Sequence, residues 1–72
     1  MNKERRKEIK KSIREIERVV QSILDEEQEA YENMPEGIQN SENGMNSIDA
    51  QDNLDAAIDA LEEAICCLEE IV

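Results

Sequence analysis

The chain has 72 residues, with 19 Asp and Glu against 8 Lys and Arg, which gives a net charge of −11. It contains no His, and Tyr31 is its only aromatic residue, so histidine-based catalysis and the common His-containing metal sites are excluded. No apolar run approaches the roughly 20 residues that a membrane-spanning helix needs. We therefore expect a single small all-α domain that is soluble and intracellular, is not an enzyme and holds no cofactor or metal.

The charges are unevenly distributed along the chain. All eight basic residues lie within the first 18 positions, and residues 19–72 contain fifteen acidic residues and no basic ones. Such asymmetry is typical of a segment that binds nucleic acid or membrane, or of two chain ends that pair within the fold. We favour pairing, because the apolar pattern places these ends side by side and no aromatic residue accompanies the basic ones. Direct nucleic-acid or membrane binding is not expected.

The first predicted helix covers residues 3–33 and ends before Pro35, since the residue before a proline disfavours helical geometry. Its apolar residues follow steps of 4, 3, 4 and 3, the repeat of a helix packed along a partner: Ile9, Ile13, Ile16, Val20 and Ile23. Glu27 interrupts this row. It indicates a rotation of the helix, a polar layer that sets the alignment, or fraying near the loop; we favour rotation or fraying.

A loop is predicted over residues 34–46, which contain Pro35 and both glycines. Pro35 suits the first position of one short helical turn, after which Ile38 and Met45 would cover the end of the bundle. The second helix is predicted over residues 47–72, capped by Asn46 or Ser47. Its apolar row again steps by 4 and 3: Leu54, Ile58, Leu61, Ile65, Leu68 and Val72.

Folding at the loop produces an antiparallel helical hairpin of coiled-coil type. One register places Ile16 opposite Ile65 and Val20 opposite Leu61, and leaves Glu27 opposite Leu54. The same register brings the basic N-terminal segment close to Glu69 and Glu70, and Arg14 and Arg18 close to Glu62 and Glu63. Parallel pairing is disfavoured by the charges, because acidic segments would then face each other.

The second helix has a second apolar strip that one partner helix cannot cover, formed by Ala57, Ala60, Ala64, Cys67 and Ile71. A lone two-helix hairpin is marginally stable, and domains of this size often need oligomerisation. We therefore predict that this strip mediates self-association into a dimeric four-helix bundle, with a foreign partner on the same strip as the alternative. Cys67 serves there as a small apolar residue, and Cys66 is expected to be exposed.

The acidic residues of the second helix occupy its remaining sides: Asp55, Asp59, Glu62, Glu63, Glu69 and Glu70. They lack the spacing of a calcium-binding loop, so metal binding is not predicted. Their rows resemble the charge spacing of a nucleic-acid backbone and would suit the basic groove of a protein partner. The plainer interpretation is a solvated surface that keeps the protein soluble, and we give it the greater weight.

A resemblance extends over most of the chain. The segment DEEQEAYENMPEG from Asp25 onward, the SENG turn and NLDAAIDALEEAI from Asn53 to Ile65 resemble small uncharacterised proteins of phages and prophages of low-GC Gram-positive bacteria. The N-terminal MNKERRKEIKK is also similar. The resemblance implies a cytoplasmic protein of the bacterial host cell that binds and inhibits a host or defence protein, in the manner of an anti-CRISPR protein. Tyr31 and Glu32, in the YENMPE segment, join the six acidic residues as candidate contacts. The alternative function is a structural homo-oligomeric module.

Overall fold

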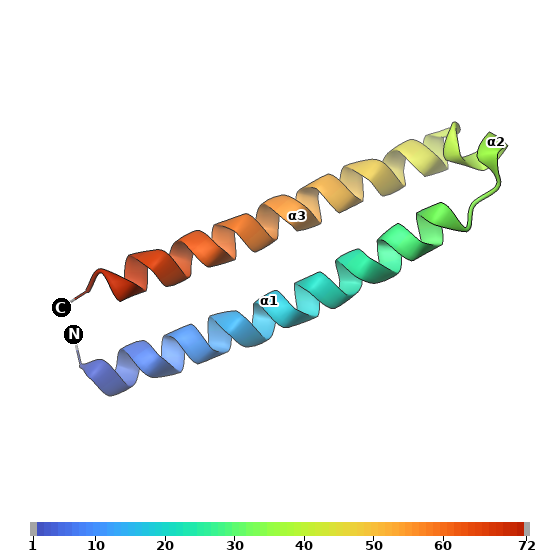
Figure 1. Ribbon diagram of the computed structural model, residues 1–72. Helices are drawn as coiled ribbons and strands as arrows, with labels where there is room; N and C mark the ends of the chain where they lie inside the picture. Colours follow the sequence, from blue (N-terminus) through green and yellow to red (C-terminus); the bar gives the residue numbers. More distant parts are fainter. Residues whose placement is uncertain (1, 72) are drawn as a thin grey trace.

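The computed structural model describes residues 2–71 and contains three helices: α1 (Lys3–Glu32), α2 (Glu36–Gln39) and α3 (Glu42–Glu69). The two long helices pack antiparallel, and both chain ends lie at the same end of the hairpin (Figure 1). The molecule is a rod with principal extents of 54 × 15 × 11 Å, so it is only one helix thick in its shortest dimension. The all-α antiparallel hairpin predicted from the sequence is confirmed.

Local capping explains the limits of α1. The Oδ1 atom of Asn2 accepts a hydrogen bond from the backbone N–H of Glu4 at 2.7 Å, which satisfies a free donor in the first turn. At the other end the N–H of Asn33 donates to the carbonyl of Glu29 at 3.0 Å, and Pro35 follows. The predicted span of 3–33 is therefore correct to within one residue.

The connection between the long helices is shorter than predicted. The turn after Pro35 forms as expected and is α2, but α3 begins at Glu42 after Ser41, so the predicted start at residue 47 and the caps at Asn46 or Ser47 are wrong. Gly44 explains the early start, because a Cβ atom at this position would lie 2.0 Å from the carbonyl oxygen of Gln39. Only glycine lets α3 begin this close to the backbone of α2.

The interior of the hairpin is small. Leu24 and Ile58, with 4% and 7% of their surface exposed, are the only buried large apolar side chains among the described residues. On α1 the half-buried Ile13 and Val20 continue the row of Leu24, whereas Ile9, Ile16 and Ile23 are exposed. Their predicted place in the hairpin seam is wrong: α1 is rotated by about 50° toward the row that contains Leu24 and Tyr31.

A polar layer sets the register near the loop. Ser47, which is 4% exposed, donates from Oγ to Oε1 of Glu27 at 2.6 Å, and Nε2 of Gln51 donates to Oγ of Ser47 at 3.4 Å. Glu27 thus pairs with Ser47 rather than lying opposite Leu54, seven residues further along α3. The shorter connection accounts for this shift, since α3 starts earlier. Of the three readings of Glu27, rotation and a polar layer both hold, and α1 does not fray here.

At the corner, Nε2 of Gln39 donates to the backbone carbonyl of Tyr31 at 3.0 Å and so ties α2 to the end of α1. Ile38 and Met45 do not cover the end of the bundle as predicted. Both are exposed, and Met45 retains 63% of its accessible surface. The early start of α3 explains this, because it places Met45 on the outside of the helix's first turn.

Candidate interaction surfaces

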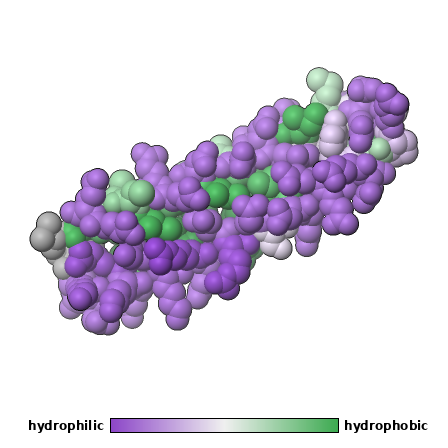
Figure 2. Space-filling model, in the orientation of Figure 1, coloured by the Kyte–Doolittle hydropathy of each residue, from purple (hydrophilic) through white to green (hydrophobic). Residues whose placement is uncertain are grey.

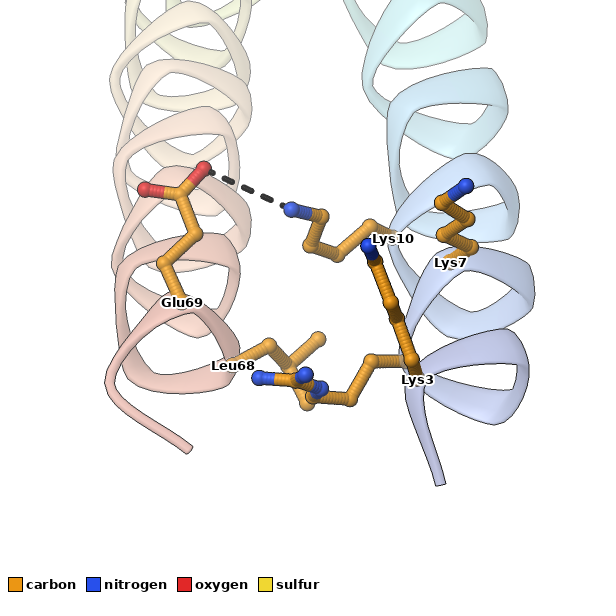
Figure 3. A pocket seen from close by; sticks show the side chains of 6 residues that line it. Lys3, Lys7, Lys10, Leu68 and Glu69 are labelled. Atoms are coloured by element: carbon orange, nitrogen blue, oxygen red, sulfur yellow. Dashed lines mark ion pairs between the residues drawn. The ribbon is translucent and has the colours of Figure 1, made fainter. Parts of the chain in front are cut away.

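One side of the hairpin carries charges from both helices. Oε1 of Glu69 lies 3.8 Å from Nζ of Lys10 (Figure 3). The same oxygen lies 3.8 Å from Nη2 of Arg14. Arg6 donates from Nη1 to the backbone carbonyl of Ile71. The predicted approach of the basic segment to Glu69 is therefore confirmed. Among the described residues, however, no ion pair joins Arg14 or Arg18 to Glu62 or Glu63. We call this side the charged face.

Two shallow hollows lie on the basic part of the charged face. The smaller, about 180 Å³, lies between the helix ends and is shown in Figure 3; Lys3, Arg6, Lys7, Lys10, Leu68 and Glu69 line it. The larger, about 410 Å³, follows α1 and is lined by Lys7, Lys10, Lys11, Arg14, Glu15 and Arg18. Both are open to solvent and hold no cluster of catalytic groups.

The opposite side of α1 carries a row of exposed aliphatic side chains. Its members are Ile9, Ile16, Val19 and Ile23, of which Ile16 and Val19 keep 52% and 58% of their surface exposed. Successive residues of an α-helix turn by about 100°, which places this row on the flank of the seam opposite the flank of Arg14. A depression of about 340 Å³ lies here, and it is bordered by Ser12, Glu15, Ile16, Val19 and Val20.

One flank of α3 lies on the same side of the hairpin as the aliphatic row of α1. The ion pairs place Glu69 on the charged flank of α3, and the same 100° rule puts Ala57, Ala64 and Ile71 on its other flank, beside the aliphatic row of α1. Ala57 is exposed, and Ala64 and Ile71 are half-buried. The two helices together form one apolar face, which we define by these three residues and the four of α1.

The predicted self-association strip is therefore divided by the structure. Ala57, Ala64 and Ile71 belong to the apolar face, whereas the exposed Ala60 and Cys67 lie on the side of α3 turned away from α1. The α1 part of the apolar face was not predicted from the sequence, because the 4-3-4-3 row assigned its isoleucines to the seam between the two helices. Val19 was the available signal: it is an aliphatic residue next to the 4-3-4-3 row but outside it.

The predicted partner contacts are also divided. Five of the six predicted acidic contacts are exposed and make no ion pair with any described residue: Asp55, Asp59, Glu62, Glu63 and Glu70. The sixth, Glu69, is engaged by Lys10 and Arg14. At the corner Glu32 is exposed, but the side chain of Tyr31 is half-buried in the hairpin.

Charge differs sharply between the two ends of the rod. The loop end, which we define as residues 25–53, contains nine acidic residues and no basic ones, a net charge of −9. The terminal end, residues 1–24 and 54–72, contains eight basic and ten acidic residues, a net charge of −2. The apolar face lies wholly within the terminal end.

In Figure 2, hydrophilic side chains surround a broken line of hydrophobic ones along the seam between the helices.

In the part of the chain that the structure describes, no three or more Cys, Asp or Glu side chains are grouped to hold a metal ion, and no helix has the length and apolarity to cross a membrane. Cys66 and Cys67 are both free and exposed.

Comparison with known proteins identifies no relative: no family model matches the chain, and no curated protein or solved structure matches it. The function of the chain is therefore inferred from its surfaces.

Proposed function

We propose that this chain is a non-enzymatic accessory protein that acts by binding other proteins. The observation that carries the proposal is the apolar face, where four large aliphatic side chains of α1 remain exposed beside Ala57, Ala64 and Ile71 of α3. Scattered single apolar residues are ordinary on a protein surface, but a row of exposed aliphatic side chains on one face, bordered by charge, is typical of an interface.

The acidic surface adds a second contact of different character. The unpaired carboxylates of α3 and the charge of −9 at the loop end would attract a partner with a basic surface and speed the encounter. Together with the resemblance to phage proteins, this supports the inhibition of a host or defence protein whose basic groove normally holds nucleic acid. Self-assembly as a structural module is the second candidate, and the apolar face favours it equally.

A phage plating assay separates these functions. The chain is expressed in bacterial hosts that each carry one nuclease-based defence system, and the plating efficiency of a restricted phage is measured. With at least one system we expect a rise on the order of tenfold or more, because a blocked nuclease no longer cleaves phage DNA. The quadruple change Asp55→Asn, Asp59→Asn, Glu62→Gln and Glu63→Gln should abolish the rise.

The control is Glu4→Gln with Glu8→Gln, which removes two acidic charges from α1 outside the proposed contact. An unchanged plating efficiency with every system would contradict inhibition and leave the structural module. A rise that survives the quadruple change would contradict the acidic contact.

A further inference from the structure

The hairpin exposes more surface than a compact monomer of the same mass. The chain exposes 5483 Å², whereas a compact monomer of 8.3 kDa exposes about 4,600 Å². The excess of about 900 Å² per chain is close to the roughly 800 Å² that each partner buries in a stable protein–protein interface.

We propose that a second copy of this chain occupies the apolar face, in an antiparallel, two-fold symmetric four-helix bundle. The inference names the partner for the apolar face of the proposed function and rests on it to that extent. An isologous interface uses the same patch on both subunits, so the patch must complement itself. In the antiparallel arrangement α1 of one copy packs on α1 of the other, so the large Ile9, Ile16, Val19 and Ile23 fit into the spaces between one another, and the small Ala57 and Ala64 let the two α3 helices approach closely.

The depression beside Ser12 marks one such space. It is bordered by Ile16 and Val19, and its volume of about 340 Å³ is large enough to take an aliphatic side chain of the partner. Because Ile16 stands at the middle of the row from Ile9 to Ile23, the two-fold axis passes close to it, and Ile9 of one copy lies near Ile23 of the other.

Charge decides the direction of the second copy. In a parallel dimer the two loop ends, each with a net charge of −9, would lie side by side. In the antiparallel dimer the terminal ends overlap, with a net charge of only −2 each, and the loop ends project in opposite directions. Repulsion between like charges therefore disfavours the parallel form. The antiparallel form also leaves both acidic loop ends free for a further partner.

The association is tested by light scattering and sedimentation from micromolar to millimolar protein. We expect a dimer for the wild-type chain, and Ile16→Glu should raise its Kd on the order of 100-fold, because a charge enters the centre of the interface on both copies. Ala57→Glu should raise Kd on the order of tenfold. Ala56→Glu, a neighbouring exposed alanine off the apolar face, is the matched control and should leave Kd within about twofold.

The direction of the second copy is tested by measuring, with electron spin resonance, the distance between one spin label on each copy. The label is attached at Gly37→Cys, where a Cβ atom meets nothing within 4 Å, in a chain that also carries Cys66→Ser and Cys67→Ser. The α1 segment from Ile16 to Glu32 alone spans about 24 Å, so the antiparallel dimer separates the two labels by about 50 Å or more. The parallel dimer holds them within about 25 Å of each other.

A wild-type monomer at every concentration, or Ala56→Glu and Ala57→Glu acting alike, overturns the dimer. A short distance between the labels overturns its direction. Circular dichroism of each variant confirms that the helices persist. The plating assay has a separate readout, so a monomer that still relieves restriction would contradict this inference and leave the proposed function standing.

Discussion

The loop end and the terminal end are made of the same two long helices, but different contacts hold the helices together at each end. At the loop end the backbones of α2 and α3 touch at Gly44, and the polar layer of Glu27 and Ser47 joins the long helices. At the terminal end the helices meet through buried and half-buried aliphatic side chains and solvent-exposed ion pairs, and a row of isoleucines is left uncovered. The loop end specifies how the hairpin aligns, and the terminal end offers surface for association.

The two buried aliphatic side chains, which lie in the terminal end where it borders the loop end, are the first place to test this difference. Leu24→Ala should lower the free energy of unfolding by about 3 kcal/mol, since it removes one of two buried aliphatic side chains and leaves a cavity. Urea unfolding followed by circular dichroism measures the change. Ile23→Ala, on the adjacent exposed residue, should cost well under half as much at protein concentrations where the chain is monomeric. Equal losses would show that the seam lies on the row predicted from sequence.

The close contact at the loop end predicts the next effect. Gly44→Ala should destabilise the hairpin by about 2 kcal/mol, because its Cβ atom cannot fit beside the carbonyl of Gln39 without opening the corner. Gly37→Ala is the control: it lies in α2 with open space around it and should stabilise the chain by about 0.5 kcal/mol. Thermal unfolding of both variants provides the comparison, and a neutral Gly44→Ala would refute the tight corner.

The polar layer predicts a non-additive result. Ser47→Ala should cost about 1–2 kcal/mol, because the half-buried carboxylate of Glu27 loses its donor. Glu27→Leu combined with Ser47→Ala should recover most of this loss, since the carboxylate that lost its donor is then absent. A double-mutant cycle by urea unfolding measures the coupling. Additive effects would mean that the two side chains do not interact.

The ion pairs of the terminal end should contribute least. Glu69→Gln removes the partner of both Lys10 and Arg14 but should cost only about 0.5 kcal/mol, because the charges are exposed to solvent. The loss should vanish at high salt, where exposed charges are screened. Glu70→Gln makes the same charge change in the adjacent residue, which forms no ion pair with any described residue, and should have a smaller effect.

The fold was predicted correctly where the sequence pattern acts independently of how the two helices pack. Pro35 ends the first helix wherever that helix packs, and the 4-3-4-3 rows of both helices require a partner along their length. The concentration of basic residues before position 19 favours the antiparallel arrangement, because it places Lys10 and Arg14 beside Glu69. The sequence therefore determined two long helices, their limits at the N-terminal end and at Pro35, and their direction.

Three features were decided only by the tertiary structure. The start of α3 depends on the approach of Gly44 to Gln39, a contact between segments that no local pattern records. The rotation of α1 depends on a choice between two overlapping apolar rows that both follow the same repeat, and packing of Leu24 settles it. The pairing of Glu27 with Ser47 then follows from both. As a result Ile9, Ile16 and Ile23, which read as core in the sequence, became an exposed surface, because a single hairpin buries only one flank of each helix.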